Sequence, residues 1–150
     1  MAPLAVGSPG TERLGGARDG AITHTIRTQW TSPNGGVDLS GTVSESADAE
    51  QNRSLAIAAT TADQEFDLDF PYADLKSIYM LASVDMTVET NAADHTGGDE
   101  ISLVANVPFS WTESSGETNP FTADVTAIFV SPDSAAASTL EIRALYASAA

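Results

Sequence analysis

The chain has 150 residues and carries 21 acidic against 6 basic side chains, a formal net charge of -15 at pH 7. This charge opposes binding to nucleic acid, because affinity for phosphate depends on lysine and arginine, and it opposes binding to anionic membranes for the same reason. The absence of cysteine excludes disulfides, thiolate nucleophiles and cysteine-ligated metal centres. We therefore expect a soluble protein with one folded domain, and neither nucleic acid nor membrane among its partners.

Residues 1–20 differ in composition from the rest of the chain. They contain five glycines, two prolines and charges that cancel, and their apolar residues follow no helix or strand period. This composition predicts an extended N-terminal arm, followed by a β-sandwich domain over residues 21–150. The arm residues that we expect to contact a partner are Leu4, Val6, Arg13, Leu14 and Arg18.

From residue 21 onward, apolar residues alternate with polar ones, which is typical of β-strands. Ile22, His24, Ile26, Thr28 and Trp30 are predicted to share one strand face, so His24 is interpreted as a half-buried packing residue rather than a metal ligand. The sequence SPNGG, followed by VDLSGTVS, predicts a hairpin. The acidic segment SESADAEQN is expected to be a linker with room for one helical turn.

Further strands are predicted in RSLAIAAT, QEFDLDF, LKSIYMLAS, DMTVET, EISLVAN, TADVTAIFV and TLEIRALY, and VPFSW is expected to extend EISLVAN. The clearest alternation places Phe66, Leu68 and Phe70 inward. LKSIYMLAS is apolar on both faces, as a central strand should be. Eight or nine short strands with regularly spaced turns predict an all-β fold, either an antiparallel β-sandwich or a jelly-roll-like barrel.

The segment NAADHTGGDE, residues 91–100, combines three acids with one of the two histidines. Asp94, Asp99 and Glu100 are possible oxygen ligands for calcium, but their spacing does not match an EF-hand loop. Because strands are predicted on both sides, we interpret the segment as a turn in which Gly97 and Gly98 supply positive φ. A bound cation is the alternative.

No catalytic set is found in the sequence. There is no G-x-S-x-G motif or Gly-rich phosphate loop, and carboxylate pairs such as Asp67 with Asp69 are interpreted as solvated strand faces rather than a glycosidase site. We therefore predict neither an enzyme nor a metal or cofactor site. The alternative is a glycan-binding module with a surface loop formed by Trp111, Glu113, Asn119 and Phe121, although core packing is the favoured interpretation of Trp111.

Three successive segments in the second half of the chain together form a recognisable pattern of strand and turn residues. The positions are Ile78, Tyr79, Ser83, Asp85, Thr87, Thr90, Asn91, Ile101, Leu103, Ala105, Pro108, Trp111, Leu140, Ile142 and Arg143. With them, residues 75–145 resemble a family of small tailed-phage and prophage proteins, whereas the long arm departs from the short N-termini of that family.

The resemblance implies a virion structural protein of the capsid decoration, or cement, type. Such a protein would be made in the host cytoplasm and would bind the outer surface of the capsid. Its implied partners are the major capsid protein and neighbouring copies of itself, with a trimer as the natural arrangement on a symmetric shell. The alternative is a glycan-binding module of the phage tail or surface.

Overall fold

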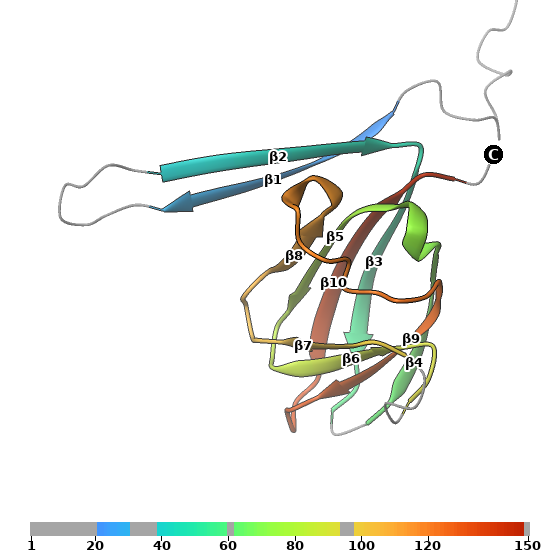
Figure 1. Ribbon diagram of the computed structural model, residues 1–150. Helices are drawn as coiled ribbons and strands as arrows, with labels where there is room; N and C mark the ends of the chain where they lie inside the picture. The colour runs from blue at the N-terminus through green and yellow to red at the C-terminus, as the bar shows by residue number, and fades with distance from the viewer. Residues whose placement is uncertain (1–20, 31–38, 60–61, 94–97, 149–150) are drawn as a thin grey trace, which may run out of the picture.

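The chain is almost entirely built of β-strands in a computed structural model, which describes residues 21–30, 39–59, 62–93 and 98–148 (Figure 1). The strands are β1 Ile22–Trp30, β2 Leu39–Ala47, β3 Ala49–Ile57, β4 Gln64–Phe70, β5 Leu75–Ala82, β6 Met86–Thr90, β7 Glu100–Leu103, β8 Phe109–Thr112, β9 Val125–Pro132 and β10 Ser138–Tyr146. Two 3-10 turns, η2 Tyr72–Asp74 and η3 Glu113–Ser115, lie between strands. Among the described residues, no helix is long and apolar enough to cross a membrane. The predicted arm lies outside the described residues.

Strands β3 to β10 form a sandwich of two four-stranded antiparallel sheets. One sheet has the order β3-β10-β5-β8 and the other the order β4-β9-β6-β7. The pairs β6–β7, β5–β8, β4–β9 and β3–β10 are nested, so the chain is arranged like one long hairpin folded over on itself. This is the strand order of a jelly roll. The prediction of an all-β, jelly-roll-like sandwich is confirmed.

Strands β1 and β2 form a separate two-stranded sheet that projects from the sandwich (Figure 1). Their antiparallel register ends with Trp30 opposite Leu39. The predicted hairpin is therefore present, while its turn at residues 32–36 lies outside the described residues. Both strands lie within residues 21–150, the predicted β-sandwich domain, whereas the two four-stranded sheets begin at Ala49.

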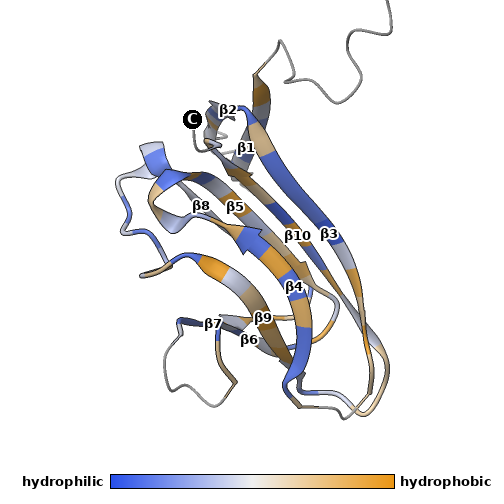
Figure 2. Ribbon diagram, turned by 90° about the vertical axis from the view of Figure 1, so that its right-hand side faces the viewer, coloured by the Kyte–Doolittle hydropathy of each residue, from blue (hydrophilic) through white to orange (hydrophobic). Residues whose placement is uncertain are grey.

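The core lies between the two sheets and follows the alternation in the sequence. In β4, Leu68 and Phe70 are fully buried and Phe66 packs against the core, while the acids between them are exposed. Figure 2 shows this alternation of hydrophobic and hydrophilic residues along β4. The largest fully buried side chains also include Ile57, Leu75, Ile78, Met80, Met86, Ile128, Leu140, Ile142 and Leu145. Burying each contributes about 1.5–3 kcal/mol, so the sandwich has a substantial core of its own.

The expected linker SESADAEQN is not a linker. Strand β2 continues through it to Ala47 and β3 begins at Ala49, with only Asp48 between them. Its polar residues are compatible with strand structure because they have partners: the Asp48 carboxylate accepts hydrogen bonds from Ser148, and the Glu45 carboxylate accepts one from the backbone N–H of Ser114. The prediction of a helical turn here is wrong.

The expected continuation of β7 into VPFSW is also wrong. Residues 109–112 form β8, which pairs with β5 in the opposite sheet. The chain crosses between the sheets at Asn106, whose φ of 60° lies in the left-handed region and whose N–H donates to Ala82 O at 2.8 Å. Asparagine tolerates this conformation better than most residues, and it redirects the chain away from β7.

Candidate docking surface

The β1–β2 hairpin has two faces of different character. Cross-strand pairs Thr23–Ser46 and Thr25–Ser44 lie on one face, and their hydroxyl oxygens are 2.8 and 3.0 Å apart. The opposite face carries the pair Ile26–Val43, and both side chains are only half-buried. An isolated two-stranded ribbon is marginally stable in water, so the position of this hairpin depends on what its less polar face contacts.

His24 attaches the base of the hairpin to the sandwich. Its Nδ1 lies 3.0 Å from Ser77 Oγ on β5, and its Nε2 lies 3.4 Å from Glu50 Oε2 on β3. These three residue types also occur in hydrolase triads, but Ser77 is 1% exposed, so its hydroxyl offers almost no surface to a substrate carbonyl. We assign the trio a positioning role. The predicted half-burial of His24 is confirmed.

The outer face of the sheet is covered where the hairpin base crosses it. Leu145, Ser77 and Thr112 form one row across β10, β5 and β8, because each pairs with the next in register. Their sequence neighbours Ala144 and Trp111 belong to the core, so by alternation this row faces outward. All three residues are nevertheless buried, and we attribute this burial to the hairpin base and η3, which contacts it.

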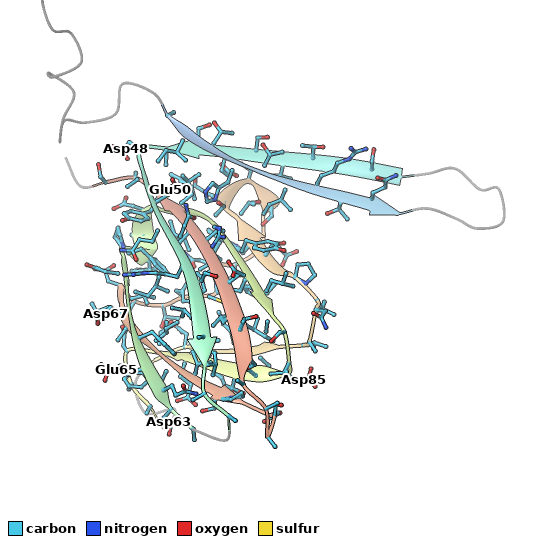
Figure 3. The ribbon with its side chains drawn as sticks, turned by 180° about the vertical axis from the view of Figure 1, so that it is seen from behind. Asp48, Glu50, Asp63, Glu65, Asp67 and Asp85 are labelled. Atoms are coloured by element: carbon cyan, nitrogen blue, oxygen red, sulfur yellow. The ribbon has the colours of Figure 1, made fainter. Side chains whose placement is uncertain are left out.

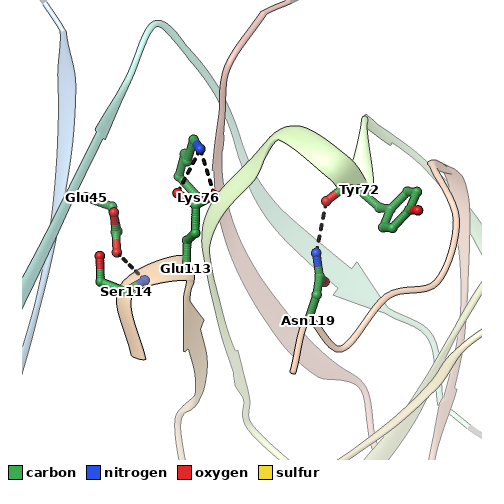
Figure 4. A network of polar contacts seen from close by, with 6 residues as sticks. All are labelled: Glu45, Tyr72, Lys76, Glu113, Ser114 and Asn119. Carbon is green, nitrogen blue, oxygen red and sulfur yellow. Dashed lines mark hydrogen bonds and ion pairs between the residues drawn. The ribbon is translucent and has the colours of Figure 1, made fainter. Parts of the chain in front are cut away.

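A polar network joins the hairpin to the loop after β8 (Figure 4). The buried Glu45 on β2 accepts a hydrogen bond of 2.8 Å from the backbone N–H of Ser114 in η3. In the same turn, Glu113 forms an ion pair of 2.7 Å with Lys76 on β5. Because each contact links η3 to a different element, η3 is held between the hairpin and the sheet.

Asp48 joins the other side of the hairpin base to the end of β10. Its two carboxylate oxygens accept hydrogen bonds from the Ser148 hydroxyl, at 2.6 Å, and from the Ser148 backbone N–H, at 2.7 Å. Hydrogen bonds to the charged form favour it, so they hold the pKa of Asp48 below its ordinary value, with the Ser148 hydroxyl as the largest cause.

Replacing Ser148 by alanine is expected to raise the pKa of Asp48 toward its ordinary value. Since this pKa is depressed in the folded state, the contact stabilises the fold at pH values above the unfolded-state pKa, and this contribution is lost as the pH falls through the folded-state pKa. Carboxyl NMR titration of both proteins measures the change directly. Ser148→Thr, which keeps the hydroxyl, is the control. An unchanged Asp48 pKa in Ser148→Ala would contradict the assignment.

Beyond its base, the hairpin forms one wall of a groove of about 450 Å³. The hairpin contributes Ile26, Thr28, Gly41 and Val43, and the opposite side is formed by all four residues of β8 with part of the loop that follows it. Strand β8 is the last strand of its sheet, and its second edge pairs with no strand of the described chain. The groove therefore combines apolar side chains with an edge strand, the two features that bind extended segments.

An exposed apolar patch lies at the start of β8. Val104 and Val107, in the crossing between the sheets, are 57% and 53% exposed, and with Phe109 they line a smaller hollow of about 150 Å³. Phe109 also lines the groove beside the hairpin, so the two depressions adjoin each other at this residue. We call the groove, β8 and the Val104–Val107 patch together the β8 docking surface.

The four residues predicted to form a surface-binding loop have other roles. Trp111 is 9% exposed and belongs to the core, and its indole N–H donates to Glu117 O at 3.0 Å. Phe121 is buried and stacks edge-on against Phe70 with ring centroids 5.2 Å apart. Asn119 donates to Tyr72 O at 2.9 Å (Figure 4).

Glu113, the fourth of these residues, holds the ion pair with Lys76. The core-packing interpretation of Trp111 is therefore confirmed, because β8 turns this side chain toward the core, opposite Ile78. Trp111 contributes only a small surface to the groove, and the structure does not provide the free indole face on which the glycan interpretation depended.

The segment 91–100 connects β6 to β7, in agreement with its interpretation as a turn. Asp99 is engaged by the protein, since its carboxylate accepts hydrogen bonds of 2.8 and 2.9 Å from the backbone N–H and hydroxyl of Thr122. Asp94, His95 and Gly97 lie outside the described residues. Within the described ranges, no group of three or more His, Asp or Glu side chains is placed to hold a metal ion.

Gly98 has a different role from the one predicted. Its φ is not in the left-handed region, but a Cβ atom at this position would lie 1.6 Å from the Thr90 carbonyl oxygen. Glycine is therefore required by the close approach of two backbones, not by a turn conformation.

The net charge of the chain is segregated along the sequence. Residues 1–47, which end with β2, carry four acids and three bases, whereas residues 48–150 carry 17 acids and three bases. The sandwich is therefore strongly acidic, and the segment that ends with the hairpin is nearly neutral. Figure 3 marks six of the acids, which lie near the hairpin base, along and before β4, and after β5: Asp48, Glu50, Asp63, Glu65, Asp67 and Asp85.

Comparisons with known proteins identify no family for this chain. No protein-family model matches it, and no curated protein matches it in sequence. Among solved structures it is similar to the Yersinia pseudotuberculosis-derived mitogen (YPM), with a TM-score of 0.31 and 10% identity, over 65% of this chain and 86% of the mitogen chain. At this TM-score the similarity supports no functional inference.

Proposed function

We propose that the protein is a virion structural protein that binds the outside of a capsid and stabilises it, as a decoration protein. The observation that carries this proposal is the β8 docking surface, where a projecting hairpin, a strand edge that is unpaired among the described strands, and two exposed valines occur together. Exposed apolar surface of this kind is typical of sites for protein partners. The jelly-roll fold is compatible with the proposal but does not decide it, since jelly rolls occur in viral capsid proteins and in lectins alike.

The distribution of charge supports the same function. Acidic sandwiches repel one another in solution, so many copies stay soluble until a neutral or basic surface is offered to them. The nearly neutral segment 1–47, which includes the hairpin, is the part of the chain that can approach another copy or the shell with the least repulsion. The N-terminal arm, residues 1–20, is the second element that we propose to contact the major capsid protein or a neighbouring copy in a trimer. This part of the proposal rests on the composition of the arm.

The copy number of the chain in purified particles tests this function. Particles from a lysate of the host that encodes the chain are expected to carry it in numbers on the order of hundreds, matching the lattice positions of a symmetric shell. Quantitative mass spectrometry against the major capsid protein measures the ratio. A handful of copies would indicate a tail component instead, and absence from particles would overturn the proposal.

A further inference from the structure

We propose that, in the free protein, the groove beside the hairpin is occupied by residues 3–6 of the same chain, bound as an extended strand along β8. The groove has apolar side chains on both of its sides, from Ile26 and Val43 on the hairpin and from Phe109 on β8. The sequence of residues 3–6 is PLAV, and it offers two large apolar side chains, Leu4 and Val6, without a charge.

The edge of β8 supplies the polar part of the contact. An edge strand presents N–H and C=O groups in a row, and an added strand pairs with them whatever its side chains are. Alternate side chains of the added strand then point to the same face, so Leu4 and Val6 enter the groove together. The neighbouring residues Gly7 and Pro9 end the strand-forming part of the segment.

The length of the intervening chain permits this contact within one copy. Fifteen residues, 7–21, separate the segment from the start of β1, and an extended chain of this length spans roughly 50 Å. The hairpin strands have nine residues, about 30 Å, and the groove lies beneath them. A segment tethered in this way is present at an effective concentration in the millimolar range, which favours its own groove over that of another copy in dilute solution.

Such a contact would cover the edge of β8, which no described strand pairs, and the apolar groove beside it. It would thereby keep the protein apart from other copies until the protein reaches its partner. The inference goes beyond the proposed function and does not require it, since the contact is made in the free protein. If the protein is a decoration protein, docking at β8 displaces the segment and frees the arm for a neighbour.

Disulfide trapping tests the contact, and the chain contains no native cysteine to interfere. In the double variant Val6→Cys/Thr118→Cys, the second position is an exposed residue that lines the groove. Mild oxidation of the dilute purified protein is expected to give an intramolecular disulfide, seen by intact mass and by faster migration on a non-reducing gel. The control is Val6→Cys/Ala136→Cys, in which the second position is exposed in the β9–β10 connection, and it should oxidise about tenfold more slowly.

A second measurement does not depend on introduced thiols. In the full-length variant Leu4→Ser/Val6→Ser, the amide protons of β8 are expected to exchange about tenfold faster than in the wild type, because the added strand no longer protects them. Equal trapping in both cysteine variants, or β8 exchange that is unchanged by the serine variant, would overturn the proposal. Predominantly intermolecular disulfides in the groove variant would also overturn it, because they would place the segment in a second copy.

Discussion

Replacing Gly98 by alanine is expected to lower the free energy of unfolding by about 3 kcal/mol, at the upper end of the range for overpacking substitutions. The added Cβ would lie 1.6 Å from the Thr90 carbonyl oxygen and 2.7 Å from the carbonyl carbon, and both atoms belong to backbone. A flexible side chain could move aside, but here the end of β6 or the start of β7 must shift. The hydrogen bond from Thr90 N–H to Asp99 O, at 2.9 Å, lies in the same contact and would be strained with it.

Gly41→Ala is the matched control for this substitution. Gly41 lies on β2, and a Cβ atom there meets no atom within 4 Å, so alanine should change the free energy of unfolding by less than about 0.5 kcal/mol. Urea unfolding of the wild type and both variants, followed by circular dichroism, measures the difference. If Gly98→Ala were as stable as Gly41→Ala, the close approach of the two backbones at Thr90 would be wrong.

Gly98 also illustrates what the sequence can and cannot predict. The alternation of apolar residues was enough to locate nearly every strand, because each strand of a sandwich turns one face to the core and this face has a period of two. The turn that contains Gly98 was also predicted, but the reason why glycine is needed there was not. A residue pattern reports local conformation, whereas the approach of Gly98 to Thr90 depends on the pairing of two strands.

The docking surface could be predicted only in part for a similar reason. The amphipathic pattern of β1 is visible in the sequence, but nothing in this pattern indicates that the less polar face extends beyond the sandwich. His24 and Ser77 are 53 residues apart, and Glu45 and Ser114 are 69 apart, so the contacts that position the hairpin have no local signature. For Trp111 the favoured interpretation, core packing, is correct. Its place before a polar loop left exposure open as the alternative, and the register of β8 with β5 decides for burial.

Introducing carboxylates into the groove is expected to abolish binding to the shell. In the double variant Ile26→Asp/Val43→Asp, two charges replace apolar side chains on the hairpin wall of the groove. A contact that buries them must remove both from water without an opposite charge, so affinity for particles should fall by about a hundredfold or more, roughly 2.7 kcal/mol. Both residues lie on the hairpin, outside the sandwich core, so the β-sandwich should remain folded.

Thr25→Asp/Ser44→Asp is the matched control, because it adds the same charge to the same two strands on the opposite, polar face of the hairpin. Particles stripped of the protein are incubated with each variant, and the bound fraction is measured after sedimentation over a range of protein concentrations. If the loss is specific to the groove face, contact geometry accounts for it, since the added charge is equal in the two variants. Equal losses in both would mean that charge repulsion alone weakens binding, and unchanged binding of the groove variant would place the contact elsewhere on the molecule. Thermal unfolding of both variants should match the wild type within a few degrees, which separates loss of contact from loss of fold.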